Sequence, residues 1–235
     1  MAPPPPAPVE VTLPLTPPQV VETTTALVWP ADDPSAPAVI LAHGAGTDMR
    51  HRHMHRHATD LAAAGAAVAL FNFAYTESGR KRPDPAPRLE SAWRDVIVGL
   101  RPHLGGDRRL VVGGRSMGGR IASMVAAADA AELGIAGVAC IAYPLHPPGK
   151  PDRLRVGHWP ALTVPTLLVC GSRDAMAPTE TLRECVATHM PQGIATVHVL
   201  AGADHSFRVR KADGRTEDEV FAETAEVLVD WLGKL

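Results

Sequence analysis

The chain has 235 residues, of which 46% are hydrophobic and 20% are charged, and its formal net charge is −2. A chain of this length buries about 70–75% of the surface that its unfolded form exposes, so its core needs no disulfide or metal for support. Nucleic-acid binding depends on clustered Lys and Arg, and the near-neutral balance argues against it. These values indicate a single globular domain without a nucleic-acid partner.

Segments for export or membrane insertion are not expected. The sequence holds no run of about eighteen apolar residues, which a transmembrane helix would need, and its first residues form neither a basic nor an apolar signal region. We therefore predict an extended or disordered proline-rich tail at residues 1–8, one domain over residues 9–235, and no membrane partner. Cys140, Cys170 and Cys185, an odd number at wide spacings, indicate reduced core thiols in a cytoplasmic protein.

The predicted elements begin with two β-rich segments between residues 8 and 29. Prolines at positions 14, 17 and 18 suit an edge strand and a turn, so we expect an antiparallel pair at one edge of a sheet. After this pair, short apolar runs alternate with longer amphipathic stretches, which is typical of a mostly parallel sheet with helices on both faces. The sequence therefore predicts an α/β fold with about seven to eight strands. The later strands are expected at 39–42, 66–73, 110–113, 135–143, 166–170 and 196–200, and the helices at 54–64, 88–104, 117–133, 178–189 and 216–232.

The most informative motif is Gly114-Arg115-Ser116-Met117-Gly118, where a predicted strand passes directly into a helix. A G-x-S-x-G motif in this context is typical of a nucleophile elbow, which presents a serine hydroxyl on a sharp turn. The glycines are needed because side chains at these two positions would collide where the helix lies close to the strand. We predict that Ser116 is a catalytic nucleophile.

A serine hydroxyl is a weak nucleophile, so it needs a base that is itself oriented by an acid. Asp174 and His205 each follow a predicted strand and lie on loops, in the chain order Ser, Asp, His that such an elbow takes. Asp204 is the alternative acid, but a sequence neighbour seldom places its side chain to pair with the imidazole of His205. The predicted catalytic residues are Ser116, Asp174 and His205.

A developing oxyanion in such a reaction needs N–H donors. We assign one donor to Met117, which follows the nucleophile, and the other to Ala45 in the small-residue turn that starts at His43, with Gly46 as the alternative. His43 is expected mainly to hold this turn in shape.

A histidine-rich segment follows this turn, with His51, His53, His55 and His57 in alternate positions. Two pairs therefore have the i, i+4 spacing of metal ligands on a helix. The interleaved arginines would repel a dication, and the glutamate of an H-E-x-x-H motif is missing, so we predict no metal site. We expect His51 to line the substrate crevice and the other three histidines to be solvated.

Further polar residues follow predicted strands on the side of the sheet where an open α/β fold has its ligand crevice. For the basic loop after Tyr75, a solvated surface is the alternative interpretation. The residues expected to contact substrate are His43, Gly46, His51, Tyr75, Tyr143 and His146.

Taken together, the turn at His43, the elbow around Ser116, and the Gly-Ser-Arg-Asp174 and Gly-Ala-Asp-His205-Ser-Phe segments resemble the α/β-hydrolases. Within this superfamily the chain resembles bacterial proteins related to dienelactone hydrolase, from about residue 39 to the C-terminus. The resemblance implies the α/β-hydrolase fold, and the short segment between predicted strands where this fold usually carries a lid implies little or no cap. True dienelactone hydrolases have cysteine at the position of Ser116, so their lactone substrate does not carry over.

The sequence thus predicts a serine hydrolase that cleaves small carboxylic esters through an acyl-enzyme and uses no cofactor. A thioesterase, peptidase or acyltransferase with the same triad is an alternative, because pocket shape selects the substrate. A non-catalytic scaffold that retains the hydrolase fold is a further alternative, against which the complete triad argues.

Overall fold

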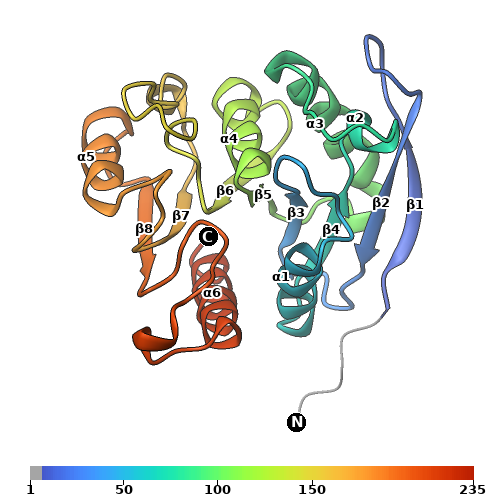
Figure 1. Cartoon of the computed structure of the whole chain (residues 1–235). Helices are drawn as coiled ribbons and strands as arrows, with labels where there is room; N and C mark the ends of the chain where they lie inside the picture. Colours follow the sequence, from blue (N-terminus) through green and yellow to red (C-terminus); the bar gives the residue numbers. More distant parts are fainter. Residues whose placement is uncertain (1–6) are drawn as a thin grey trace.

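The computed structural model describes residues 7–235, which form an open sheet of eight strands with helices on both faces (Figure 1). The strand order is β1-β2-β4-β3-β5-β6-β7-β8; β1 and β2 pair antiparallel, as do β2 and β4, and all other neighbours are parallel. The predicted α/β fold with an antiparallel N-terminal edge is confirmed. The tail predicted at residues 1–8 lies almost wholly outside the described residues. The strands are β1 (Val9–Pro14), β2 (Thr23–Trp29), β3 (Ala38–Ala42), β4 (Ala67–Phe71), β5 (Leu110–Arg115), β6 (Ile135–Ile141), β7 (Thr166–Gly171) and β8 (Ala195–Leu200).

The centre of the sheet explains where the site forms. Every residue of β3 and β4 is buried, because helices cover both faces of these parallel strands. The chain runs from β3 to β4 on one side and then crosses to β5 on the other side of β3, so the strand order reverses there. In open α/β sheets the ligand crevice lies at the carboxyl ends of the strands at such a reversal. The loops after β3 and β5 meet at this point.

The helices divide between the two faces of the sheet. α1 (Arg52–Ala63) and α6 (Glu217–Leu232) pack on one face and contact each other, whereas α3, α4 and α5 pack on the other face (Figure 1). The five predicted helices are confirmed to within a few residues, and the short helix α2 was not predicted. The remaining elements are α2 (Ala74–Glu77), α3 (Ala86–Leu100), α4 (Met117–Asp129), α5 (Thr179–His189) and three 3-10 turns at Pro102–Leu104, Trp159–Ala161 and Lys211–Asp213.

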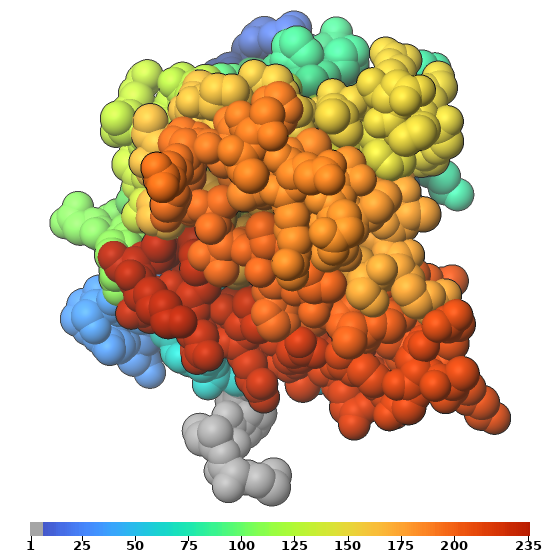
Figure 2. All heavy atoms as spheres, turned by 90° about the vertical axis from the view of Figure 1, so that its left-hand side faces the viewer, coloured from blue at the N-terminus to red at the C-terminus, as the bar shows by residue number. Residues whose placement is uncertain are grey.

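Helix α6 is fixed at its start by reciprocal hydrogen bonds. The Thr216 hydroxyl accepts from the N–H of Glu219 at 3.2 Å, and the Glu219 carboxylate accepts from the N–H of Thr216 at 2.7 Å. The helix then buries Val220, Phe221 and Trp231 against α1 and the sheet. The C-terminal part of the chain, from α5 to α6, covers a large part of one side of the molecule (Figure 2).

Little chain is available to cover the carboxyl ends of the strands. The segment between β6 and β7 is a loop with a single 3-10 turn, which agrees with the predicted lack of a large cap. Cys140, Cys170 and Cys185 are free and buried, and burial raises the pKa of Cys140 to about 12. Of the helices within residues 7–235, none is long and apolar enough to cross a membrane.

Candidate active site

Ser116 lies at the turn between β5 and α4 with a strained backbone. Its φ is 50° and its ψ is −113°, a backbone conformation that residues other than glycine rarely adopt. The turn is held from both sides, because its N–H donates to the carbonyl of Ile141 at 2.8 Å and its carbonyl accepts from the N–H of Arg120 at 3.0 Å. The backbone therefore fixes the Ser116 hydroxyl at the carboxyl end of the sheet.

Two glycines permit the close approach of α4 to the strands. A Cβ on Gly118 would lie 2.1 Å from the carbonyl oxygen of Ala42, and a Cβ on Gly114 would lie 2.2 Å from the same oxygen. Neither contact can be relieved by a side-chain rotation, because the blocking atom belongs to the backbone of β3. The elbow motif is thus a steric requirement of this packing.

His205 connects Ser116 to a buried carboxylate. Its Nε2 lies 3.0 Å from the Ser116 Oγ, and its Nδ1 lies 2.7 Å from the Asp174 Oδ2. The side chain of Asp174 is fully buried, and its other oxygen accepts from the N–H of Met176 at 2.8 Å. A carboxylate at Nδ1 selects the tautomer in which Nε2 can accept the serine proton.

Asp204, the alternative acid, has a different function. Its Oδ1 accepts from the N–H groups of Ser206 at 2.8 Å and Arg208 at 3.0 Å, so it stabilises the loop that carries His205. The structure brings Ser116, Asp174 and His205 together, and the ring of His205 is hydrogen-bonded to Asp174 rather than to Asp204.

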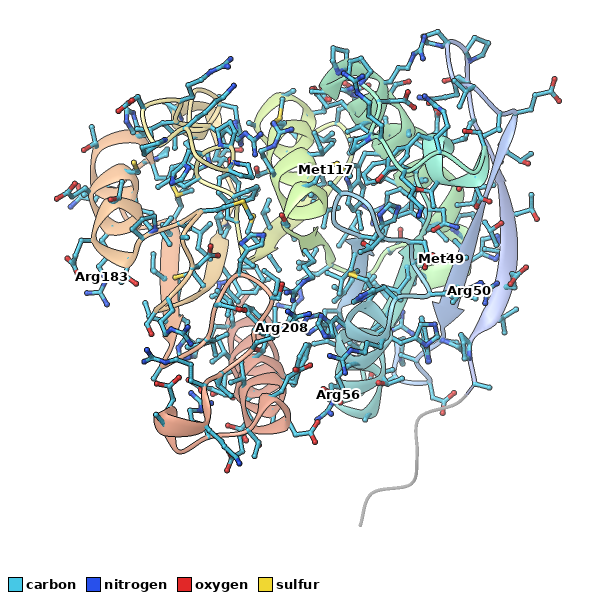
Figure 3. All side chains as sticks on the ribbon, in the orientation of Figure 1. Met49, Arg50, Arg56, Met117, Arg183 and Arg208 are labelled. Carbon is cyan, nitrogen blue, oxygen red and sulfur yellow. The ribbon has the colours of Figure 1, made fainter. Side chains whose placement is uncertain are left out.

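A cavity of about 520 Å³ lies beside Ser116 and His205, within the size range of small-molecule sites. Ala45 and Met117, the predicted oxyanion donors, are part of its wall. Met117 is the first residue of α4 (Figure 3), so its N–H has no acceptor inside the helix and is free to bind an anion. A nucleophile, a base, an acid and N–H donors at one cavity suit acyl transfer.

A family model described as an alpha/beta hydrolase domain matches residues 35–233. The chain belongs to this family. Membership of the α/β-hydrolases supports a hydrolase activity.

Solved structures of other α/β-hydrolases share the fold over nearly the whole chain. A dienelactone hydrolase from Anabaena variabilis has a TM-score of 0.74 and 20% identity, with 97% of this chain and 98% of that chain covered. An α/β serine hydrolase without a lid from Xanthomonas campestris has a TM-score of 0.69 and 17% identity, with coverage of 97% and 96%. A cold-adapted esterase from an Arctic intertidal metagenomic library has a TM-score of 0.66 and 18% identity, with coverage of 94% and 92%. At these identities the likeness shows the fold.

In this α/β-hydrolase, His43 holds the turn after β3 from within the core. It is fully buried; its Nδ1 lies 2.8 Å from the carbonyl oxygen of Gly44, and its Nε2 accepts from the N–H of Phe73 at 3.3 Å. Burial lowers the pKa of His43 to about 4, so the ring is neutral near pH 7. His43 thus holds the turn in shape, as predicted, and it is not among the residues that line the cavity.

Four other residues predicted to contact substrate also lie outside the cavity wall: Gly46, Tyr75, Tyr143 and His146. The Tyr143 hydroxyl donates to the carbonyl of Arg155 at 2.6 Å, and the Nδ1 of His146 lies 2.9 Å from the carbonyl oxygen of Pro147. Both tyrosines and His146 are buried. Their large side chains are covered by the core, because burying their apolar surface is more favourable than exposing it in the crevice.

The histidine-rich segment divides between cavity and core. His51 lines the cavity as predicted and also caps α1, since its Nδ1 accepts from the N–H of His53 at 3.2 Å. His53 and His57 are buried, although His53 also borders the cavity, and the ring of His57 lies 5.1 Å from that of Phe221 on α6. Their predicted solvation is wrong because α1 packs this face against α6; helical spacing of the buried residues was the available signal. Within residues 7–235, no group of three His, Cys, Asp or Glu side chains is placed to hold a metal.

Arg115 is a site residue that the sequence analysis missed. Its guanidinium donates to the carbonyl of His205 at 2.9 Å and lies 4.7 Å from the ring centre of Phe207, which has a positive φ of 65°. Burial lowers the pKa of Arg115 to about 10, and the negative charge of Asp174 is the largest effect that opposes this shift. One side chain thus links the nucleophile elbow to the loop of the base. Its position inside the G-x-S-x-G motif was the only signal in the sequence.

Proposed function

We propose that the protein is a serine hydrolase that cleaves small carboxylic esters through an acyl-enzyme. The observation that supports this proposal is the hydrogen-bonded series from Ser116 through His205 to buried Asp174 at the wall of the cavity. The esterase among the similar folds is consistent with it.

In the proposed mechanism, the Ser116 oxygen attacks the ester carbonyl while the Nε2 of His205 takes its proton. Asp174 accepts from Nδ1 and stabilises the imidazolium that forms. The N–H groups of Met117 and Ala45 stabilise the oxyanion. His205 then gives the proton to the departing alcohol, and a water molecule activated by His205 hydrolyses the acyl-enzyme and restores the Ser116 hydroxyl.

The lack of a large cap and the cavity volume of about 520 Å³ favour short acyl chains. Thioesters, amides and acyl acceptors other than water can use the same triad, so a panel of esters, thioesters and aminoacyl amides defines the bond that is cleaved. A scaffold without activity would hydrolyse none of them.

The test compares p-nitrophenyl acetate and butyrate turnover by the wild type and Ser116→Ala. We expect turnover to be lost in the variant, and a fluorophosphonate to label the wild type at Ser116. The matched control is Ser35→Ala, an exposed serine in the loop before β3, which should react like the wild type. Equal rates for wild type and Ser116→Ala, or no labelling at Ser116, would contradict the proposal.

A further inference from the structure

Four arginines border the cavity: Arg115, which holds the His205 loop, Arg208, which is exposed, and the partly buried Arg120 and Arg155. The proposed mechanism does not use Arg120 or Arg155. Arg120 lies four residues after Ser116 in the first turn of α4, and its side chain is part of the cavity wall. Its N–H donates to the carbonyl of Ser116 at 3.0 Å, so the two residues are adjacent at the start of the helix. Arg120 and the nucleophile therefore border the same cavity.

Arg155 reaches the same cavity from the loop between β6 and β7. Its backbone is held in place, because its N–H donates to the carbonyl of Leu145 at 2.8 Å and its carbonyl accepts from the hydroxyl of Tyr143 at 2.6 Å. The buried position of Tyr143 makes it an anchor for this loop. Arg155 is thus presented by a fixed segment, which limits the entropy lost when it binds a ligand.

The two guanidinium groups are neighbours of like charge. Burial is the main cause that lowers the pKa of Arg155, and the charge of Arg120 is the next. Neither arginine takes part in any of the arginine ion pairs formed within residues 7–235. The Arg120 side chain donates to the sulfur of Met124 at 3.2 Å, and its Nε is buried without a partner among the described residues.

The carboxylate at the cavity does not neutralise the charges of Arg120 and Arg155. Asp84 is the single carboxylate among the described residues that border the cavity, and it lies between two other arginines. Its Oδ1 is 3.0 Å from Arg80 and 3.7 Å from Arg88. Two partly buried positive charges without a counter-charge are unfavourable, and an anion between them would remove this repulsion.

We propose that the substrate carries a carboxylate or phosphate group and that Arg120 and Arg155 bind it. The inference rests on the proposed function, which places the scissile ester at Ser116. Arginine forks bind both kinds of anion with paired hydrogen bonds, so two unpaired arginines at the cavity favour a short ester with an acidic group over a neutral one. We assign Arg115 to the loop of the base rather than to this subsite, because its guanidinium donates to the His205 carbonyl.

The first experiment measures selectivity between matched esters. It compares kcat/KM for the p-nitrophenyl hemiester of succinic acid with kcat/KM for p-nitrophenyl butyrate, which is neutral and of similar length. We expect Arg120→Gln and Arg155→Gln each to lower this ratio about tenfold or more, the usual effect of losing a charged hydrogen-bond partner. Arg120→Lys should restore part of the ratio because it keeps the charge. The control Arg153→Gln, an exposed arginine of the same loop outside the cavity, should keep the wild-type ratio. A ratio that is unchanged in both glutamine variants would overturn the proposal.

The second experiment measures binding without hydrolysis. Calorimetry on Ser116→Ala with monomethyl succinate and, separately, with inorganic phosphate identifies which anion binds more tightly. Adding Arg120→Gln should weaken that binding about tenfold or more. Binding that depends on the arginines in a protein that hydrolyses no ester would contradict the proposed function and support the subsite. If the protein hydrolyses esters but the arginine substitution leaves its affinity for both anions unchanged, the subsite is overturned and the proposed function stands.

Discussion

Replacing His57 by leucine should stabilise the fold. His57 is buried between α1 and α6, and neither ring nitrogen has a hydrogen-bond partner among the described residues. One of these nitrogens carries a proton in the neutral ring, and an unsatisfied buried donor costs about 1–3 kcal/mol. Leucine fills a similar volume beside Phe221 without that penalty. We expect His57→Leu to raise the free energy of unfolding at pH 7 by about 1 kcal/mol or more.

The gain should increase at lower pH. Burial, followed by the charges of Arg115, His53 and Arg56, lowers the pKa of His57 well below its ordinary value of 6.5. As the pH falls below 6.5, the unfolded chain binds a proton that the native fold excludes, so the wild type loses stability. At pH 5 the difference of about 1.5 pH units, at about 1.36 kcal/mol per unit, amounts to about 2 kcal/mol. The leucine variant avoids this loss.

The assay is urea unfolding, followed by circular dichroism, at pH 7 and pH 5. The stability difference between His57→Leu and the wild type should be larger by about 2 kcal/mol at pH 5 than at pH 7. The matched control is His103→Leu, which replaces an exposed histidine in the 3-10 turn after α3 and should show the same difference from the wild type at both pH values. A His57→Leu protein that is less stable than the wild type, or whose advantage does not depend on pH, would refute the reasoning.

Three further predictions concern the elbow and the triad. Gly118→Ala should lower the free energy of unfolding in urea by about 3 kcal/mol or more, because its Cβ would meet a carbonyl oxygen at 2.1 Å. In the control Gly46→Ala the Cβ has open space but φ is 75°, so the free energy of unfolding should fall by only about 1–2 kcal/mol. Similar losses in the two variants would contradict the steric argument. Arg115→Met should lower kcat/KM for p-nitrophenyl butyrate about tenfold and slow fluorophosphonate labelling, because the His205 loop loses its hydrogen bond to Arg115. Unchanged values would show that this bond does not position the base. Asp174→Asn should lower kcat by about 10⁴-fold and Asp204→Asn by far less, and the reverse order would assign the acid to Asp204.

The sequence by itself determined the order and type of the main elements, and it predicted three residues that the structure brings together at the site. Apolar runs bounded by glycine and proline predicted the parallel strands, because strands buried on both faces have no polar positions. The glycines around Ser116 predicted the elbow for a steric reason that local sequence already contains. Asp174 and His205 followed from chain order, since parallel strands bring the loops at their carboxyl ends to one edge.

Tertiary structure decided which side chains on those loops face the cavity. Local patterns do not distinguish a tyrosine that lines a crevice from one that anchors a loop, as Tyr143 does through Arg155. The burial of His53 and His57 depends on α6, a helix from the far end of the chain that packs on α1. Arg155 and Arg120 share the cavity although they come from a loop and a helix 35 positions apart. The burial and the protonation state of a side chain depend on neighbours that are distant in sequence. Spacing along the sequence shows only the neighbours that are close in sequence.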